Sequence, residues 1–195
     1  MLKRFEIALL IGLIVGIMIS SLSAFASESA QIRSQVLRLH VIANSDNEED
    51  VDLKFAVRDA VLESRAELFA SAGDIEEIRE LAAQSLDIIE AAARDEISRR
   101  GYSYTVRAEL VNMYFATRQY EGFIMPAGRY DAVRLIIGDG GGENWWCVMF
   151  PPMCLPAAGQ GSGASLQERI NALGQTPQYV PKFAIVELIE GLFRN

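Results

Sequence analysis

The residues with the clearest chemical potential are one histidine and two cysteines. His40, Cys147 and Cys154 are the only residues of their types among 195. A histidine next to a cysteine forms a thiolate–imidazolium nucleophile, and Asn144 or Asp46 could orient its ring. The chain has no local signature for such a pair, and it lacks the Gly-x-Ser-x-Gly motif of α/β-hydrolases. A single histidine on a strand is more often a structural hydrogen-bonding residue, so we expect no catalytic residues.

Binding of a metal, a nucleotide or a nucleic acid is not indicated either. No two of the three residues above have the spacing of metal ligands. The glycine-rich segment 138–144 lacks the Gly-Lys-Ser/Thr ending of a phosphate-binding loop, and no helix is expected after it. Nucleic-acid binding requires clustered cations, whereas the chain has 18 Lys and Arg residues against 26 Asp and Glu residues. We therefore expect no cofactor, no nucleic-acid partner and no small-molecule substrate.

The N-terminus has the pattern of an export signal. A basic start precedes an uncharged apolar run over residues 7–19, and Ala24-Phe25-Ala26 has the small-x-small pattern that signal peptidase accepts. We expect residues 1–26 to be a signal peptide that is recognised at Ala24 and Ala26 and cut after Ala26. The alternative is an uncleaved anchor, because the uncharged stretch continues to Ser27 and is long enough to cross ~30 Å of hydrocarbon as a helix. In both cases the rest of the protein is exported.

The exported part changes from helical to strand periodicity along its length. A strand is predicted over residues 35–43, with His40 on the face opposite its apolar residues. Two amphipathic helices follow, opened by the capping-box pairs Ser45/Glu48 and Asp74/Glu77. The strands that come next are predicted over 105–115, 130–137 and 145–150, with a loop between the first two and a glycine turn between the last two. This order predicts an α+β fold in which an antiparallel or mixed sheet of about four strands packs against a long helical hairpin.

Both tryptophans and both cysteines fall within residues 144–154. Trp145 and Trp146 are adjacent, so on a strand they point to opposite faces, and at most one belongs to a single core layer. The other covers a helix or a partner, and tryptophan is a favoured interface residue. Cys147 and Cys154 could form a disulfide if the chain reverses between them, which export permits; two buried thiols are the alternative.

The C-terminal part is a separate segment. Residues 157–164 form a Gly-rich linker, and two short helices are predicted after it, as a C-terminal helical extension of the fold. The last helix is strongly apolar, so it either docks on the core or contacts a partner or a membrane surface. The expected organisation is therefore a leader over 1–26, a domain over 27–156 and this extension over 157–195.

Two long motifs resemble the stage II sporulation protein R family. The first runs from Leu37 to Asp46 and continues in Asp52-Leu53-Lys54 and Val57-Arg58-Asp59. The second comprises Pro126-Ala127-Gly128, Tyr130, Ile137-Gly138, Asn144 to Cys147 and Pro151 to Cys154. The resemblance covers residues 35–155 and does not reach the C-terminal helices.

The resemblance implies a signalling role in endospore formation. Proteins of this family are made in the forespore and exported into the space between the forespore and mother-cell membranes. There they activate a membrane-embedded aspartic protease of the mother cell, which processes the sigma-E precursor. For this chain the resemblance implies a signalling domain over residues 27–156, no enzymatic activity, and the extracytoplasmic part of that protease as partner. Membrane contact is expected only through the leader or the C-terminal helix.

We expect the partner to contact the corner between the first strand and the first helix, together with one of the tryptophans. The candidate contact residues are His40, Asn44, Ser45, Asp46, Trp145 and Trp146. The alternative is that both motifs specify the fold. Two other function classes stay open: an extracytoplasmic Cys/His or wall-remodelling hydrolase, and a structural adhesion or scaffold module.

Overall fold

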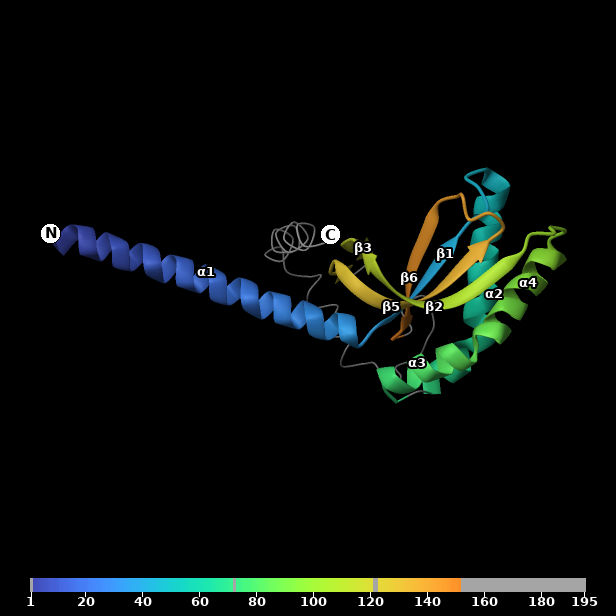
Figure 1. Ribbon diagram of the computed structural model, residues 1–195, viewed down its shortest axis with the longest axis horizontal. Coiled ribbons are helices and arrows are strands. Elements are labelled where there is room, and N and C mark those ends of the chain that lie inside the picture. Colours follow the sequence, from blue (N-terminus) through green and yellow to red (C-terminus); the bar gives the residue numbers. More distant parts are fainter. Residues whose placement is uncertain (1, 72, 121–122, 152–195) are drawn as a thin grey trace.

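The computed structural model describes residues 2–71, 73–120 and 123–151. Cys154, the Gly-rich linker and the expected C-terminal helices lie outside these residues. The helices are α1 (Leu2–Ser34), α2 (Glu48–Ser71), α3 (Ile75–Gln84) and α4 (Leu86–Arg99). The strands are β1 (Leu37–Ile42), β2 (Val106–Phe115), β3 (Arg118–Tyr120), β4 (Phe123–Met125), β5 (Gly128–Ile137) and β6 (Asn144–Phe150) (Figure 1).

Four of the strands form a mixed sheet in the order β2-β5-β1-β6. β1 runs parallel to β5 and antiparallel to β6, while β5 runs antiparallel to β2. The parallel strands β1 and β5 need a long crossover connection between them. Helices α2, α3 and α4 lie in this connection, between β1 and β2. The predicted α+β class is therefore confirmed, including the mixed sheet of four strands.

Helices α2, α3 and α4 cover one face of this sheet (Figure 1). Leu37, Leu39 and Val41 of β1 point to these helices and are fully buried, as their alternation in the sequence predicts. The helices contribute residues at helical spacing: Leu53, Val57, Val61, Ile78, Ala82, Ile89, Ala93 and Ile97. This first cluster is the main hydrophobic core of the described residues.

The second arm of the helical hairpin is bent. Asp74 caps α3 as predicted, since its carboxylate accepts a hydrogen bond from the Glu77 backbone N–H at 2.9 Å. The Glu77 carboxylate accepts from the Gly73 N–H at 2.8 Å instead of from the Asp74 N–H, so the second bond of the predicted capping box is shifted by one residue. The sequence periodicity suggested one helix up to Arg100, but α3 ends at Gln84 and α4 begins at Leu86. Ser85 breaks the helix, because its backbone leaves the helical region and its N–H bonds to Ala82 O in a tighter turn.

The opposite face of the sheet is covered in part by the end of α1 and by a β-hairpin. Strands β3 and β4 pair in a separate two-stranded sheet, within a segment that the sequence predicted as a plain loop. Their side chains and those of α1 close a second hydrophobic cluster, which contains Phe25, Ile32, Val36, Phe115, Ile124, Met125, Tyr130, Ala132 and Val148. The hairpin was not predicted because three-residue strands are too short to show a period.

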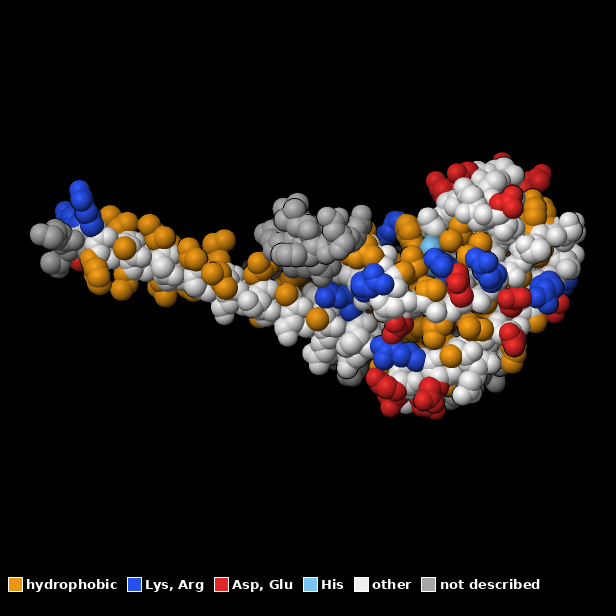
Figure 2. Space-filling view, in the orientation of Figure 1, with side chains coloured by type: hydrophobic (Ala, Val, Ile, Leu, Met, Phe, Trp, Pro, Cys, Tyr) orange, Lys and Arg blue, Asp and Glu red, His pale blue; other side chains and the backbone are white. Residues whose placement is uncertain are grey.

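The first part of α1 extends away from the domain (Figure 1). Its large apolar side chains from Phe5 to Ile19 are exposed, and Figure 2 shows hydrophobic side chains along this part of the helix. Lys3–Ser34 is the one helix in the described part of the chain that is long and apolar enough to cross a membrane. The helix does not end at Ala26, the expected cleavage position.

Candidate functional site

The turn between β1 and α2 is held by side-chain hydrogen bonds. Asn47 caps α2, because its Oδ1 accepts a hydrogen bond from the Asp50 backbone N–H at 2.7 Å. The predicted capping box of Ser45 and Glu48 is therefore wrong: α2 begins at Glu48, which makes Asn47 the capping residue. Ser45 instead donates from its hydroxyl to Asp50 Oδ2 at 2.6 Å.

Asp50 is the buried centre of this turn. Its side chain is 1% exposed, and Oδ2 accepts a second hydrogen bond, from Asn44 Nδ2 at 2.9 Å. Burial acts to raise the pKa of the Asp50 carboxyl, but hydrogen bonds from Ser45, Asn44 and Tyr104 outweigh it and lower the pKa below the ordinary 3.8. Asp50 is therefore ionised at neutral pH and joins the end of β1 to the start of α2.

The glycine turn between β5 and β6 packs against the same corner. The Gly141 N–H donates to Asn44 O at 3.1 Å, and the Asp139 N–H donates to Asn44 Oδ1 at 3.0 Å. The Glu143 N–H donates to the Asp46 carboxylate. Three of the expected contact residues, Asn44, Ser45 and Asp46, thus have structural partners, and they link two loops that lie far apart in the sequence.

Because these two loops lie so close together, we expect a single methyl group added at Gly142 to lower the stability of the protein. A Cβ at Gly142 would overlap the backbone carbonyl oxygen of Ser45, which cannot move without disturbing the corner. We expect Gly142→Ala to lower the free energy of unfolding by about 2 kcal/mol, measured by chemical denaturation. The matched control is Gly73→Ala, where a Cβ would meet only Glu77 Oε2 at 3.6 Å; equal stability of the two variants would contradict the described packing.

His40 lies on the sheet face that points away from helices α2 to α4. Its side chain is 4% exposed, Nε2 donates to Asn144 Oδ1 at 2.7 Å, and its ring stacks on Trp146 with centroids 5.8 Å apart. Burial lowers the pKa of His40, and the positive charges of Arg134 and Arg38 lower it further, against the opposing hydrogen bond with Asn144. His40 is therefore neutral at pH 7.

The structure does not assemble a nucleophilic pair from His40 and Cys147. Leu39 is the sheet partner of Cys147, whereas His40 is the partner of Trp146, so the two side chains point to opposite faces. Cys147 belongs to the first hydrophobic cluster. It is also disulfide-bonded and so carries no thiol; Cys154 lies outside the described residues, and the pairing of these two cysteines stays a prediction.

The lowered pKa of His40 gives the stability of the protein a pH dependence. The unfolded chain binds a proton at His40 near the ordinary pKa of 6.5, whereas the folded chain does so only at lower pH. Stability is therefore greatest above pH 6.5 and falls as the pH decreases below it. We expect the denaturant concentration at the midpoint of unfolding to decrease as the pH is lowered from 7.5 to 5. The slope of this midpoint against pH should be smaller in His40→Gln. Because His40 is the only histidine, an unchanged slope in the variant would contradict the assigned environment.

The two adjacent tryptophans have different surroundings. Trp145 points to the helical layer, where its ring meets Phe55 of α2 edge-on with centroids 5.1 Å apart. Trp146 points to the opposite face, where the guanidinium carbon of Arg118 lies 3.9 Å from its ring centroid. Within the described part of the chain, neither indole N–H has a hydrogen-bond partner, although both are shielded from solvent. The structure thus shows which tryptophan packs on a helix, a question that the sequence left open.

Arg38 is a buried cation that the sequence did not single out. It is fully buried, and its guanidinium carbon lies 4.1 Å from the ring centroid of Phe115 and 5.1 Å from that of Tyr130. Nη2 donates to the Tyr120 hydroxyl, while Nε and Nη1 have no hydrogen-bond partner among the described residues. Burial lowers the pKa of this arginine. The alternation of β1 placed Arg38 on this face, but the β3–β4 hairpin that supplies Tyr120 was not predicted.

A row of side chains crosses the sheet on the face that carries His40. The strand register aligns Glu109, Arg134, His40 and Trp146, one from each strand in the order β2, β5, β1 and β6. Arg134 pairs with Glu109 at 2.7 Å, and both are about one-third exposed. The next row toward the glycine turn contains the partly exposed Ile136 and Ile42.

We refer to Ile42, Arg118, Arg134, Ile136 and Trp146, with His40 beneath them, as the basic–aromatic face. These residues are exposed or half-buried except His40, so neither α1 nor the hairpin covers them completely. Figure 2 shows basic, acidic and hydrophobic side chains mixed over the middle of the domain, with further acidic groups at its upper and lower ends. Aromatic and arginine side chains with apolar neighbours are typical of protein–protein contact surfaces.

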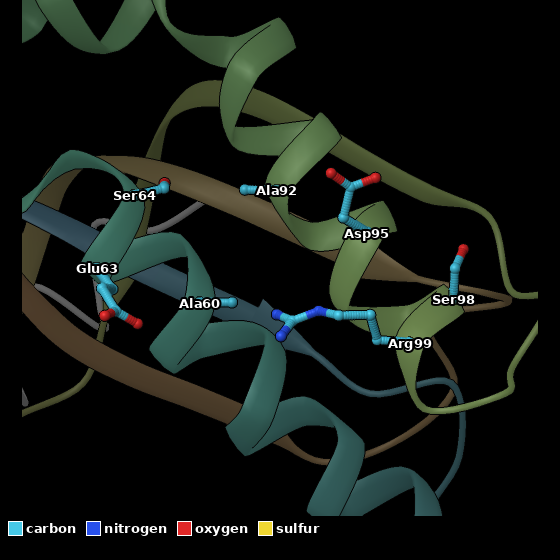
Figure 3. Close-up of a pocket in the computed structure, with 7 residues that line it drawn as sticks. All are labelled: Ala60, Glu63, Ser64, Ala92, Asp95, Ser98 and Arg99. Atoms are coloured by element: carbon cyan, nitrogen blue, oxygen red, sulfur yellow. The ribbon is translucent and has the colours of Figure 1, made fainter.

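A surface groove also lies between α2 and α4 (Figure 3). Its lining residues are Ala60, Glu63, Ser64, Ala92, Asp95, Ser98 and Arg99. Glu63 and Asp95 come from different helices and do not point toward one another, so the groove does not hold the close carboxylate pair that acid–base catalysis uses. Within the described ranges, no group of three His, Cys, Asp or Glu residues could hold a metal ion.

Comparison with known proteins decides the family. The sequence profile of the family described as Stage II sporulation protein R (spore_II_R) matches residues 33–160. This chain belongs to the stage II sporulation protein R family. The match contains β1 to β6, the corner around Asp50 and the basic–aromatic face, so these features are parts of the family's domain. The resemblance seen in the sequence is thereby confirmed.

A curated relative supports the same assignment. The protein "Stage II sporulation protein R" of Bacillus subtilis (strain 168) is 34% identical to this chain over 137 residues. The aligned part is 70% of this chain and 61% of the relative, so the chain spans about three-fifths of the relative's length. No solved structure matches this chain. The family name supports a sporulation protein of regulatory type.

Proposed function

We propose that this protein is an exported intercellular signal of endospore formation. In this proposal its domain is transferred out of the forespore across the forespore membrane and activates the mother-cell membrane aspartic protease that processes the sigma-E precursor. The observation that carries the proposal is the family match over residues 33–160. The apolar helix at the N-terminus is consistent with transfer of the domain across the forespore membrane, and the space between the two membranes is the proposed location.

The proposed mechanism is activation by binding, with no chemistry performed by the signal itself. The only histidine and Cys147 point to opposite faces of the sheet, which argues against the alternative of a Cys/His hydrolase. A binding protein activates its target when it has higher affinity for the active state than for the inactive state. We therefore assign the domain the role of stabilising an assembled, active state of the protease.

The basic–aromatic face is the surface that we assign to this contact. Trp146 is half-buried, and the exposed Arg118 stacks on its ring. Arg134 and Ile136 extend the surface onto β5. A complementary partner surface would carry apolar residues for the tryptophan and carboxylates for the arginines, because Arg pairs with carboxylates through two parallel hydrogen bonds.

The corner residues receive a different role in this proposal. Asn44, Ser45 and Asp46 use their side chains within the network around Asp50 and the glycine turn. Substituting these residues would lower the stability of the fold, and signalling would decrease only as a consequence of that loss. Trp145 also belongs to the fold, since it packs against α2. Of the six expected contact residues, we thus keep Trp146 and His40 for the docking surface.

A genetic experiment tests the proposed role in its own cell. The gene is deleted in the sporulating bacterium and restored under a promoter that is active only in the forespore. We expect the sigma-E precursor to stay unprocessed in the deletion strain and to be processed again after restoration. The control is a restored gene that lacks codons 2–24, whose product stays in the forespore cytoplasm and should not restore processing. Normal processing in the deletion strain would contradict the proposed function.

A further inference from the structure

Helix α1 continues without a break through the position at which a signal peptide would be cut. Its last turns carry Phe25, Ser29 and Ile32 at the i, i+4 and i+7 spacing of one helix face, and all three are buried. Phe25, 2% exposed, and Ile32 are members of the second hydrophobic cluster. A cut after Ala26 would remove Phe25 from this cluster and leave a new chain end in the middle of a packed helix.

Hydrogen bonds also tie the end of α1 to the domain. Arg33 Nη1 donates to the carbonyl oxygen of Ala127 at 3.0 Å, and Arg79 Nη2 of α3 donates to the carbonyl oxygen of Ser34 at 3.2 Å. The Arg33 side chain lies so close to Gly128 that a Cβ there would overlap its Cδ and Nε atoms. The end of α1 is thus fixed to both the hairpin side and the helical side of the sheet.

The rest of α1 has the length and surface of a membrane-spanning helix. Residues 7–24, between Glu6 and the buried Phe25, contain no charged side chain. As a helix they are about 27 Å long, near the lower end of the ~17–25 residues that span a bilayer. The large apolar side chains from Ile7 to Ile19 are exposed, so the domain does not cover them. Lys3 and Arg4 at the start fit the cytoplasmic side of the membrane.

We propose that α1 is not cleaved, and that it anchors the domain in the bilayer while its last turns form part of the folded domain. The spanning part passes directly into the packed part at Phe25, so the domain rests at the membrane surface on the exported side. The end of α1 packs on the same side of the sheet as the basic–aromatic face. A partner of that face would therefore present a segment close to the membrane.

The first test measures the mass and location of the full chain. The protein, tagged at its C-terminus, is expressed in a bacterium with active signal peptidase, and its membranes are washed with alkaline carbonate. The comparison is Ala24→Phe, which places a bulky residue in the recognition pattern at an exposed position. We expect both proteins to keep residues 1–26 and to stay in the membrane. A wild-type chain that begins at Ser27 and is released, while Ala24→Phe is retained, would overturn the proposal.

The second test measures whether the last turns of α1 belong to the domain. Phe25→Ala and Phe5→Ala are matched variants of the full chain in detergent, because Phe25 is 2% exposed and Phe5 is 73% exposed. We expect Phe25→Ala to lower Tm by about 6 °C or more and Phe5→Ala to leave it unchanged. Equal Tm values for the two variants would overturn the proposal. Neither test measures signalling, so the result is independent of the proposed function.

Discussion

Replacing Trp146 with alanine is expected to remove most of the signalling activity at a given amount of folded protein. Trp146 carries the central apolar surface of the basic–aromatic face, and Arg118 stacks on it from the exposed side. Truncation of a tryptophan at the centre of an interface typically costs at least ~2 kcal/mol, which corresponds to about 30-fold weaker binding. The measurement is the protein concentration that gives half-maximal processing of the sigma-E precursor.

The neighbouring tryptophan provides the matched control. Trp145→Ala removes a ring of the same size from the opposite face, where it packs on Phe55, so we expect lower stability but unchanged activity per folded molecule. Arg118→Glu is a second test at an exposed residue, and it should weaken signalling without a loss of stability. Equal losses of activity in Trp145→Ala and Trp146→Ala, with full activity in Arg118→Glu, would assign the tryptophans to the fold and reject this docking surface.

Replacing Asp50 with alanine is expected to give the largest loss of stability of any single carboxylate substitution at the β1–α2 corner. The change leaves the Asn44 amide and the Ser45 hydroxyl without their buried acceptor. Hydrogen bonds to a charged group contribute about 1.5–3 kcal/mol each, so we expect a loss of about 3 kcal/mol. This corresponds to a decrease in Tm of roughly 6–12 °C for a domain of this size, measured by thermal unfolding.

Asp52→Ala serves as the control for this prediction. Asp52 lies two residues further along α2 and is exposed, so its substitution removes a carboxylate of equal charge without opening the network. We expect its free energy of unfolding to change by no more than about 0.5 kcal/mol, the range of ordinary surface substitutions. A similar decrease for both variants would mean that net charge, and not the buried network, determines the stability of the corner.

The layered part of the fold could be predicted because its residues alternate or repeat regularly. Leu37, Leu39 and Val41 alternate with Arg38 and His40, and the structure places these two sets on opposite sides of β1. Positions that depend on a few backbone angles were not predictable in this way. The bend at Ser85 interrupts a spacing that would also fit one straight helix, and the change of cap from Ser45 to Asn47 depends on where α2 begins.

The candidate site was only partly predictable for a different reason. The sequence indicated Trp145 and Trp146 and the fact that they point to opposite faces, but it did not show which face is covered by helices. That depends on the register of β6 against β1, which pairs Trp146 with His40. The contact of Arg118 with Trp146 depends on how the β3–β4 hairpin packs on the sheet. This packing joins residues far apart in the sequence and leaves no periodic signal in it.

The most direct test of the proposed function is reconstitution in a bacterium that does not form spores. The full chain is expressed with the membrane aspartic protease and the sigma-E precursor, and the size of the precursor is followed on a gel. We predict processing only when all three proteins are present, and a strong reduction with Trp146→Ala. An unprocessed precursor, with the protease and this protein both shown to be folded and in the membrane, would contradict the role as activator.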